Sequence, residues 1–395
     1  MTVIEVGDAR VMFGDCRDVL KTLADCSVDS VVTDPPYELG FMGKKWDSTG
    51  IAYDVSVWVE CLRVLKPGGH ILAFGGSRTF HRMAVAIEDA GFEIRDSIAW
   101  MYGSGFPKSL DVSKAIDKAA GYQGEVIGTE TVDVGIQGGS MHAGRSQKLE
   151  EREIRELSSE AKQWQGWGTA LKPAFEPIVV GRKPFAKGST VAANVLEHGV
   201  GGLNIDASRI DAKGRPLIEK TGEKWAGSNM DSAGSKAVGA TDLGRWPANV
   251  ILDEYSAGLL DEQSGENPSR FFYCAKASKR DRNEGLDGLE DRVGEHGNKW
   301  TDQDYRRGDD APTTARKNFH PTVKPTALMR YLIKLVTPAG GTVLDPFTGS
   351  GSTGKAALLD GYKFVGAELT EEYLPIIEGR LRWANEQEAD DETLF

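Results

Sequence analysis

Short apolar runs alternate with amphipathic stretches over the first hundred residues of the chain. The β-branched and aromatic runs predict strands over 3–13, 28–33, 70–74 and 92–100. Apolar residues at helical spacing predict helices over 18–23, 55–65 and 80–90, and a turn is expected at 67–69. Strands and helices that alternate with short connections are typical of a parallel α/β sheet.

This regularity breaks after about residue 103 and returns at His320. Within the glycine-rich and polar middle, the pattern predicts helices over 148–162 and 191–198 and strands over 175–181 and 249–252. After His320 it predicts helices over 326–336 and 354–360 and strands over 343–344 and 362–367. Long irregular stretches are usually functional or disordered, so we interpret 186–319 as an inserted recognition region, with a flexible decoration as the alternative.

Composition narrows the class of protein. The chain has 395 residues and a net charge of −12, which argues against a protein that coats nucleic acid but allows a local basic groove. The four cysteines form no Cys-x-x-Cys pair and the six histidines no His-x-x-x-His pair, so we expect no disulfide frame and no metal site. Without a signal peptide or a long apolar run, we expect a cytoplasmic protein that does not bind a membrane.

The residues after the 28–33 strand offer groups that suit an amine on a flat ring. Asp34 supplies a carboxylate and Tyr37 an aromatic face. Pro35 and Pro36 lack N–H groups and fix the backbone, so that its carbonyls stay available as acceptors. Such acceptors can turn the nitrogen of the amine into a nucleophile. An ordinary proline-rich turn is the alternative.

A second site is predicted at the glycine turn that precedes the 354–360 helix. Gly349 and Gly351 would let the backbone approach a ligand, and Glu368 ends the next strand, where acidic residues meet ribose hydroxyls in dinucleotide-type folds. Residues 349–355 also fit the Gly-x-x-x-x-Gly-Lys pattern of a phosphate-binding loop. Ala356 stands where that loop needs a hydroxyl for Mg²⁺, which disfavours a nucleoside triphosphatase.

The two motifs together resemble those of the amino-group DNA methyltransferases. The catalytic motif of that family is similar to Asp34-Pro35-Pro36-Tyr37, and its cofactor motif is similar to Asp345-Pro346-Phe347-x-Gly349-x-Gly351-x-Thr353. Family segments that contact the cofactor are similar to Gly14-Asp15 and His320-Pro321-x-x-Lys324-Pro325. The catalytic motif comes first and the cofactor motif last, an order that resembles the β class of the family. Long phage-borne members have inserts of this length.

The resemblance implies an α/β fold with a Rossmann-like methyltransferase sheet, circularly permuted, and a large loop-rich insert. It implies S-adenosyl-L-methionine as cofactor, DNA as partner, and methyl transfer to the N6 of adenine in a flipped-out base. The implied catalytic residues are Asp34, Pro35, Pro36 and Tyr37. The implied cofactor-binding residues are Asp15, Lys324, Asp345, Pro346, Phe347, Gly349, Ser350, Gly351, Thr353 and Glu368.

Four parts are expected along the chain. Residues 1–185 form the catalytic half, with a loop-rich insertion over about 103–170, and 320–385 form the cofactor-binding half. Between them, 186–319 form the target-recognition insert, and 386–395 form a disordered acidic tail. Basic residues of the insert are predicted to contact DNA, with a solvated, ion-paired face as the alternative: Lys276, Lys279, Arg280 and Arg282.

Other functions remain open from the sequence. The same geometry permits N4-cytosine methylation, although family members of that kind more often have serine where Asp34 stands, which favours adenine. A DNA-binding module with an inactive site is a more remote alternative. C5-cytosine methylation needs a cysteine, usually after proline, and no cysteine here follows a proline. The recognition sequence, a homodimer and a restriction partner are not determined by the sequence.

Overall fold

The computed structural model describes residues 2–39, 45–103, 109–133, 149–224, 233–275, 280–291 and 317–392. The chain divides into two compact units. The first comprises Met1–Trp100, Glu176–Leu286 and His320–Phe395, and the second comprises Met101–Phe175 and Asp287–Phe319. The segment 186–319, expected to be one recognition insert, is therefore shared: its residues up to Leu286 belong to the first unit.

A ten-stranded sheet forms the centre of the first unit, in the order β1-β2-β14-β13-β3-β4-β8-β5-β11-β12. Its strands are β1 Val3–Val6, β2 Ala9–Phe13, β3 Val28–Thr33, β4 Leu65–Phe74, β5 Glu93–Met101, β8 Phe175–Arg182, β11 Val250–Asp253, β12 Tyr273–Ala275, β13 Thr342–Asp345 and β14 Lys363–Glu368. Strands β2, β14, β13, β3 and β4 run parallel, and β8 is antiparallel to β4. The last two strands of the chain thus lie between strands from its beginning, and the predicted permuted α/β sheet is confirmed.

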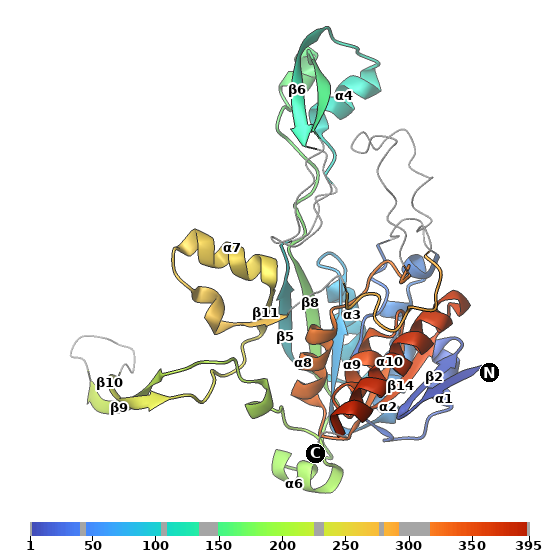
Figure 1. The fold of residues 1–395 in the computed structure, drawn as a ribbon, viewed down its shortest axis with the longest axis vertical. Helices are drawn as coiled ribbons and strands as arrows, with labels where there is room; N and C mark the ends of the chain where they lie inside the picture. The colour runs from blue at the N-terminus through green and yellow to red at the C-terminus, as the bar shows by residue number, and fades with distance from the viewer. Residues whose placement is uncertain are drawn as a thin grey trace. The chain divides into compact units, whose positions relative to one another are not determined.

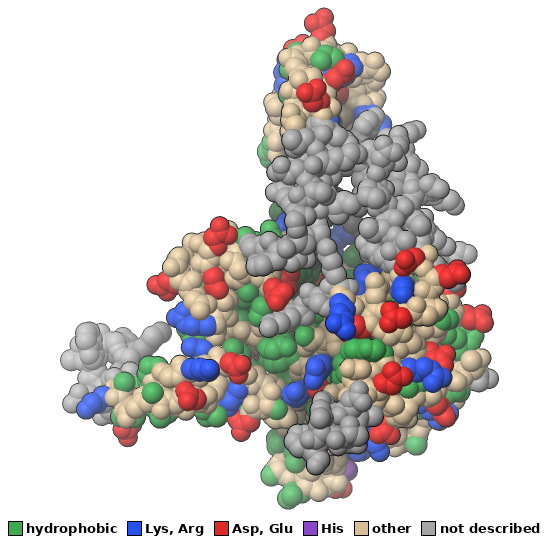
Figure 2. Space-filling model, in the orientation of Figure 1, with side chains coloured by type: hydrophobic (Ala, Val, Ile, Leu, Met, Phe, Trp, Pro, Cys, Tyr) green, Lys and Arg blue, Asp and Glu red, His purple; other side chains and the backbone are tan. Residues whose placement is uncertain are grey.

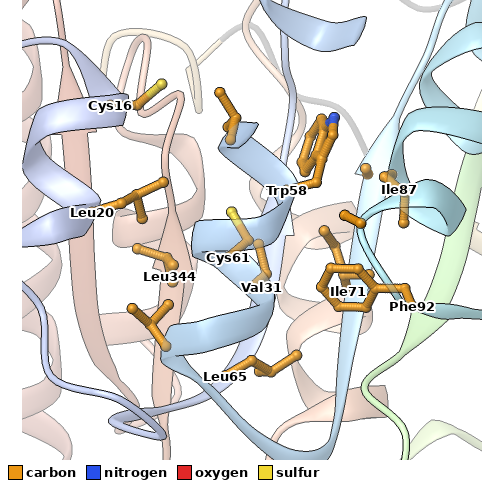
Figure 3. Packing of buried hydrophobic residues seen from close by; sticks show 14 of the residues in the cluster. Cys16, Leu20, Val31, Trp58, Cys61, Leu65, Ile71, Ile87, Phe92 and Leu344 are labelled. Carbon is orange, nitrogen blue, oxygen red and sulfur yellow. The ribbon is translucent and has the colours of Figure 1, made fainter. Parts of the chain in front are cut away.

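Helices cover both faces of this sheet (Figure 1). The helices of the first unit are α1 Cys16–Lys21, α2 Val55–Val64, α3 Phe80–Asp89, α6 Val191–His198, α7 Glu254–Ser264, α8 Thr326–Val336, α9 Ser352–Leu358 and α10 Leu374–Glu392. On one face, α1, α2 and α3 pack against the strands through a buried cluster that includes Leu20, Trp58 and Ile87 (Figure 3). On the other face lie α8, α9 and α10 (Figure 1).

The remaining elements are hairpins and short helices. Strands β9 Arg215–Lys224 and β10 Ala233–Thr241 form a two-stranded antiparallel ribbon in the first unit. The second unit contains α4 Val112–Ala120, the antiparallel pair β6 Val126–Asp133 and β7 Leu149–Arg155, and α5 Ser159–Lys162. The helix predicted over 148–162 is therefore wrong, because its first half pairs with β6, a strand that the sequence pattern did not indicate.

Three further predictions need correction. The strand predicted over 3–13 is a hairpin, since β1 and β2 pair antiparallel around Gly7 and Asp8. The turn predicted at 67–69 lies inside β4, where the register against β3 shifts between Leu65 and His70. The acidic tail begins as helix, because the backbone of α10 continues to Glu392. Among the residues that the structure describes, no helix is long and apolar enough to cross a membrane.

Candidate active site

Parallel strands end at one edge of the sheet, and the predicted site residues follow these ends. Asp15 follows β2 and Asp34 follows β3, while β13 ends at Asp345 and β14 at Glu368. Because the carboxyl ends of parallel strands meet at the same edge, both motifs lie there although they are far apart in sequence. The Gly14 N–H donates to the Glu368 carbonyl at 2.9 Å, which ties β2 to β14 at this edge.

Asp345 joins the two motifs through its hydrogen bonds. Its Oδ1 accepts from Thr33 Oγ1 at 2.6 Å and from Phe347 N at 3.0 Å, and its Oδ2 accepts from Thr353 Oγ1 at 2.6 Å. Burial raises the pKa of Asp345 to about 6, although these three donors favour the carboxylate. The carboxylate therefore fixes the end of β3 against the glycine turn and the start of α9.

The glycine turn is shaped by residues on both of its sides. Gly349 has a φ of +55° and Gly351 a φ of +73°, in the left-handed region that glycine adopts most easily. A Cβ on Gly349 would lie 3.1 Å from Nε2 of His320, a tighter contact than most side chains make, so a side chain there would require the His320 ring to shift. Arg380, fully buried in α10, donates from Nη1 to the carbonyl oxygen of Ser350 at 2.8 Å. The conformation of the turn is thus supported by contacts from α10 and from the segment before α8.

Glu368 lies beside this turn. Its Oε2 accepts from Gly349 N and its Oε1 from Thr370 N, both at 2.7 Å. Burial raises the pKa of Glu368 to about 7, despite these two N–H donors. Each carboxylate oxygen has acceptor capacity beyond one N–H, so Glu368 can shape the turn and still accept from a ligand hydroxyl.

Asp15 is engaged locally. Its Oδ1 accepts from the backbone N–H of Arg17 at 2.9 Å and thereby caps α1. Its Oδ2 accepts from Arg17 Nη2 at 2.6 Å. The hydrogen bonds from Arg17 lower the pKa of Asp15 against the opposing effect of burial, so this carboxylate is ionised at neutral pH.

Lys324 is the centre of a buried cluster that contains the carboxylate of the first motif. Its Nζ lies 2.8 Å from Asp34 Oδ2, 3.2 Å from Glu176 Oε2 and 3.1 Å from the hydroxyl oxygen of Tyr37. The Tyr37 hydroxyl donates to Glu176 Oε2 at 2.8 Å. The ammonium group also lies 4.9 Å from the ring centroid of Phe74. The cluster joins residues that follow β3 to the end of β4, the start of β8 and the segment before α8.

The charges in this cluster determine which of its atoms can still donate a hydrogen bond to a ligand or accept one from it. Burial alone would lower the pKa of Lys324, but the carboxylates of Asp34 and Glu176 outweigh it and the pKa is raised. Burial and the same two carboxylates raise the pKa of the Tyr37 phenol, so Tyr37 is a neutral donor. Asp34 Oδ1 is buried and has no hydrogen-bond partner among the residues that the structure describes, which leaves one strong acceptor unsatisfied.

Comparison with known proteins decides the family. A family model of the N6/N4 methyltransferases, described as DNA methylase, matches residues 28–379. The chain belongs to this family. The sequence-based prediction of family is thereby confirmed, and so is the predicted cofactor, since S-adenosyl-L-methionine is the methyl donor of this family.

Individual relatives of this methylase match over different lengths. The type II methyltransferase M.HindIII of Haemophilus influenzae is 24% identical over 317 residues, which are 79% of this chain and 64% of that protein. The DNA adenine methyltransferase YhdJ of Escherichia coli is 42% identical over 72 residues, which are 18% of this chain and 24% of YhdJ. The matched region is therefore less than two thirds of either relative.

Solved structures resemble the methylase at low sequence identity. The PvuII DNA methyltransferase (cytosine-N4-specific) is 14% identical with a TM-score of 0.44, over 97% of this chain and 90% of that one. The M1.HpyAVI–SAM complex is 17% identical with a TM-score of 0.40, over 94% of this chain and 98% of that one.

The lysine of the phosphate-loop pattern is not available to a nucleotide in this methylase. Lys355 is fully buried, and its Nζ lies 2.6 Å from Asp281 Oδ1 and 2.8 Å from Glu284 Oε2. It also lies 4.7 Å from the ring centroid of Trp383 in α10. A lysine held by two carboxylates cannot also reach β- and γ-phosphates, which argues against the triphosphatase alternative.

The residues predicted to contact DNA differ in their surroundings. Lys276 and Lys279 lie outside the described residues. The Arg280 side chain is 85% exposed and lies 3.5 Å from a carboxylate oxygen of Glu284. Arg282 donates from Nη2 to the carbonyl oxygen of His320, so it holds the segment before α8. Of the two described arginines, Arg280 is the one that projects into solvent.

Two members of the site were not proposed from the sequence. Glu176 completes the Lys324 cluster from the start of β8, and Arg380 supports the glycine turn from α10. Glu176 had a usable signal, because it is a carboxylate directly before the apolar run of residues 177–180. Arg380 had none, since α10 itself was not predicted and a buried arginine looks in sequence like any exposed one.

Proposed function

We propose that this methylase transfers a methyl group from S-adenosyl-L-methionine to the N6 of an adenine that is turned out of the DNA duplex. The observation that carries the proposal is the buried Oδ1 of Asp34, which accepts no hydrogen bond from the described part of the chain. A buried acceptor without a donor costs free energy, about 1–3 kcal/mol or more for a charged group. An amino group placed at this atom supplies the missing donor.

The glycine turn has the features that this cofactor requires. Glu368 keeps acceptor capacity for ribose hydroxyls, and the left-handed Gly349 presents backbone where a side chain would clash with His320. We assign Asp15, Phe347, Gly349, Gly351 and Glu368 to contacts with the cofactor. Four further residues shape the turn around it: Asp345, Pro346, Ser350 and Thr353. When bound, the cofactor supplies an electrophilic methyl group on a sulfonium.

The residues of the first motif act on the target amine. Asp34 Oδ1 and the carbonyl oxygen of Pro35 each accept one amine hydrogen, which concentrates electron density on the nitrogen. Lys324 holds the other oxygen of Asp34 at 2.8 Å, so the free oxygen keeps a fixed orientation. The Asp34 carboxylate is also placed to take the proton that the nitrogen loses. Tyr37 stacks on the base, an interaction worth about 1–3 kcal/mol.

Adenine is the favoured base over cytosine for two reasons. The motif begins with Asp34, where N4-cytosine members more often have serine. The relative YhdJ, 42% identical over its matched region, is named a DNA adenine methyltransferase. N4-cytosine methylation remains the second candidate, because an exocyclic amine on cytosine offers the same two hydrogens to the same two acceptors.

The test is methylation of duplex DNA with a cofactor labelled on its methyl group, followed by hydrolysis to nucleosides. Label in N6-methyladenine is the expected result, and label in N4-methylcytosine would overturn the choice of base. If the protein binds the cofactor but transfers no label to DNA, the alternative of a DNA-binding module with an inactive site would be favoured. Modified-base sequencing of DNA from a methylation-free host that expresses the chain then identifies the recognition sequence. A single short sequence would match a type II modification role, as in the name of M.HindIII.

A further inference from the structure

Three segments from the 186–286 part of the chain meet at the β11–β12 edge of the sheet. They are the turn after the short 3-10 helix η4 Asp206–Ser208, the residues before β11, and the 3-10 helix η5 Pro268–Phe271. Ile210 and Arg245 exchange both backbone hydrogen bonds, at 3.0 Å and 2.7 Å. The Ala99 N–H donates to the Asn249 carbonyl at 2.9 Å, which anchors this region to β5.

Arginine and aromatic side chains stack on one another where these segments meet. The guanidinium carbons of Arg245 and Arg270 lie 4.9 Å and 4.6 Å from the ring centroid of Phe271. That of Arg209 lies 5.7 Å from the ring centroid of Trp246. We call these five residues the arginine–aromatic cluster. Trp246 is 66% exposed and Phe271 46% exposed, so the rings are not the core of the region.

The cluster keeps most of its positive charge. Arg245 donates to the carbonyl oxygens of Asp211 and Arg270, at 3.3 Å and 3.1 Å, and Arg270 donates to the carbonyl oxygen of Asn267. Within the described part of the chain, neither Arg245 nor Arg270 forms an ion pair with a carboxylate, whereas Arg209 pairs with Asp206 at 2.8 Å. Hydrogen bonds to neutral carbonyls orient a guanidinium without neutralising it.

This arrangement is unusual for a chain with a net charge of −12. Figure 2 shows Lys and Arg side chains gathered between α7 and the β9–β10 ribbon on the face that it draws. An acidic protein that leaves arginines uncompensated beside exposed rings has a surface complementary to a polyanion with flat bases. Arginine also suits phosphate better than lysine does, because its planar fork can donate two hydrogen bonds at once.

We propose that the arginine–aromatic cluster is a DNA-binding surface of this methylase, separate from the predicted basic residues 276–282. Arg245 and Arg270 bind phosphates of the duplex, and Trp246 packs against the sugar or an exposed base. The proposal rests on the proposed function, since it takes DNA as the substrate. It locates part of the affinity for DNA in residues that neither motif contains.

The test compares two double variants of the full-length chain by titration of a fluorescent duplex at several salt concentrations. R245Q/R270Q removes both charges, and R245K/R270K keeps them. Each phosphate contact contributes about 0.9 to the slope of log affinity against log salt, so the Gln variant should have a slope shallower by about 1.8. The Lys variant should keep most of the slope. R10Q/R382Q, which changes two exposed arginines elsewhere in the first unit, is the matched control and should leave the slope unchanged.

Two other results would overturn the proposal. An unchanged slope in R245Q/R270Q, with methylation intact in the unaltered chain, would refute this surface and leave the proposed function standing. Equal loss of affinity in the Lys and Gln variants, together with a lowered melting temperature, would make the cluster a packing device only. Failure of the unaltered chain to bind or methylate DNA would instead refute the proposed function itself. S-adenosyl-L-methionine affinity, measured by calorimetry, should stay the same in all variants.

Discussion

At the scale of single residues, one lysine determines which atom of the catalytic motif is free. The Nζ of Lys324 lies within 3.2 Å of Asp34 Oδ2, Glu176 Oε2 and the Tyr37 hydroxyl oxygen. One ammonium between two carboxylates leaves the cluster with a net negative charge when both are ionised. A buried negative charge next to an empty acceptor favours a ligand that brings N–H donors. An exocyclic amine fits that requirement, and a phosphate does not.

Asp34→Ala should lower the rate of methyl transfer by at least about 10²-fold and spare cofactor binding. The variant removes the acceptor for the amine, while Glu368 and the glycine turn are untouched. Loss of one preorganised acceptor typically costs about 10²–10³ in rate. Initial rates and the calorimetric affinity for S-adenosyl-L-methionine should be measured on the same preparation. Turnover near that of the unaltered enzyme would refute the role assigned to Asp34.

Glu368→Gln should weaken cofactor binding by about tenfold or more, because hydrogen bonds to a charged group contribute about 1.5–3 kcal/mol. Affinity of the unaltered enzyme should also fall as the pH drops below about 7, where Glu368 takes up a proton. The Gln variant should lack this step. Calorimetry between pH 6 and pH 8.5 would reveal both effects, and equal affinities at all pH values would exclude Glu368 from the cofactor site.

The Glu368 carboxylate should also make the free energy of unfolding depend on pH in a predictable direction. The folded protein raises the pKa of Glu368 from its ordinary 4.5 to about 7, so the folded state binds the proton more tightly than the unfolded chain does. Its contribution is therefore largest at low pH and is lost as the pH rises from about 4.5 to 7, by about 3 kcal/mol in total. The Gln variant should show a flatter pH dependence of unfolding free energy. Parallel curves in urea titrations would contradict this.

At the scale of elements, the sequence predicted those whose signals are local. β3 follows from a run of β-branched residues and occurs at Val28–Thr33 as expected. α6 begins where Thr190 accepts from Ala193 N and ends at the left-handed Gly199, and its predicted range is correct. β6 and β7 were missed because each depends on a partner distant in sequence, and the charged residues of β7 suit an exposed helix equally well.

In the candidate site, too, the sequence predicted the residues with local signals and missed the contacts between distant residues. The sequence placed Asp34 and Glu368 at strand ends, because a strand and its stop signal lie side by side in the chain. It could not reveal that Thr33 donates to Asp345, since those residues are 312 positions apart. It also could not separate Lys355, which is buried on two carboxylates, from the lysine of a phosphate loop. Long-range partners decide such roles, and one sequence does not record them.

Lys355→Met should destabilise the protein strongly and leave its nucleotide specificity unchanged. The variant removes the buried cation that lies within 2.8 Å of both Asp281 and Glu284. Breaking a buried ion pair from one side costs about 3–5 kcal/mol. Urea unfolding should therefore shift to a clearly lower midpoint. Lys363→Met, at an exposed position in β14, is the control and should change stability by less than about 0.5 kcal/mol.

A second measurement on Lys355→Met tests the phosphate-loop alternative. Mg-ATP should bind neither the unaltered chain nor the variant, because the lysine is already committed to carboxylates. Tight Mg-ATP binding that Lys355→Met abolishes would restore that alternative. A variant as stable as the unaltered chain would instead show that the ion-pair cluster does not support α9.

At the scale of the whole molecule, the residues assigned to cofactor and amine all belong to the first unit. The first of the two segments of the second unit, Met101–Phe175, is inserted in sequence between β5 and β8, which are neighbours in the central sheet. At the base of the insertion, the Tyr102 N–H donates to the Ala174 carbonyl at 2.9 Å. The two ends of the insertion are thus held together by the backbone, and a short loop can replace what lies between them.

A variant in which a short Gly-Ser loop replaces residues 103–173 should therefore fold and bind S-adenosyl-L-methionine. Its cofactor affinity should stay within about twofold of the full chain, since a unit with its own hydrophobic core can fold alone. Calorimetry with the cofactor and a thermal melt should be run on this variant and, in the same background, with Glu368→Gln as the negative control. If the deleted protein melts cooperatively but does not bind the cofactor, residues between 103 and 173 are needed for the site. Binding that survives deletion and weakens by about tenfold or more with Glu368→Gln assigns the cofactor to the edge formed by β13 and β14.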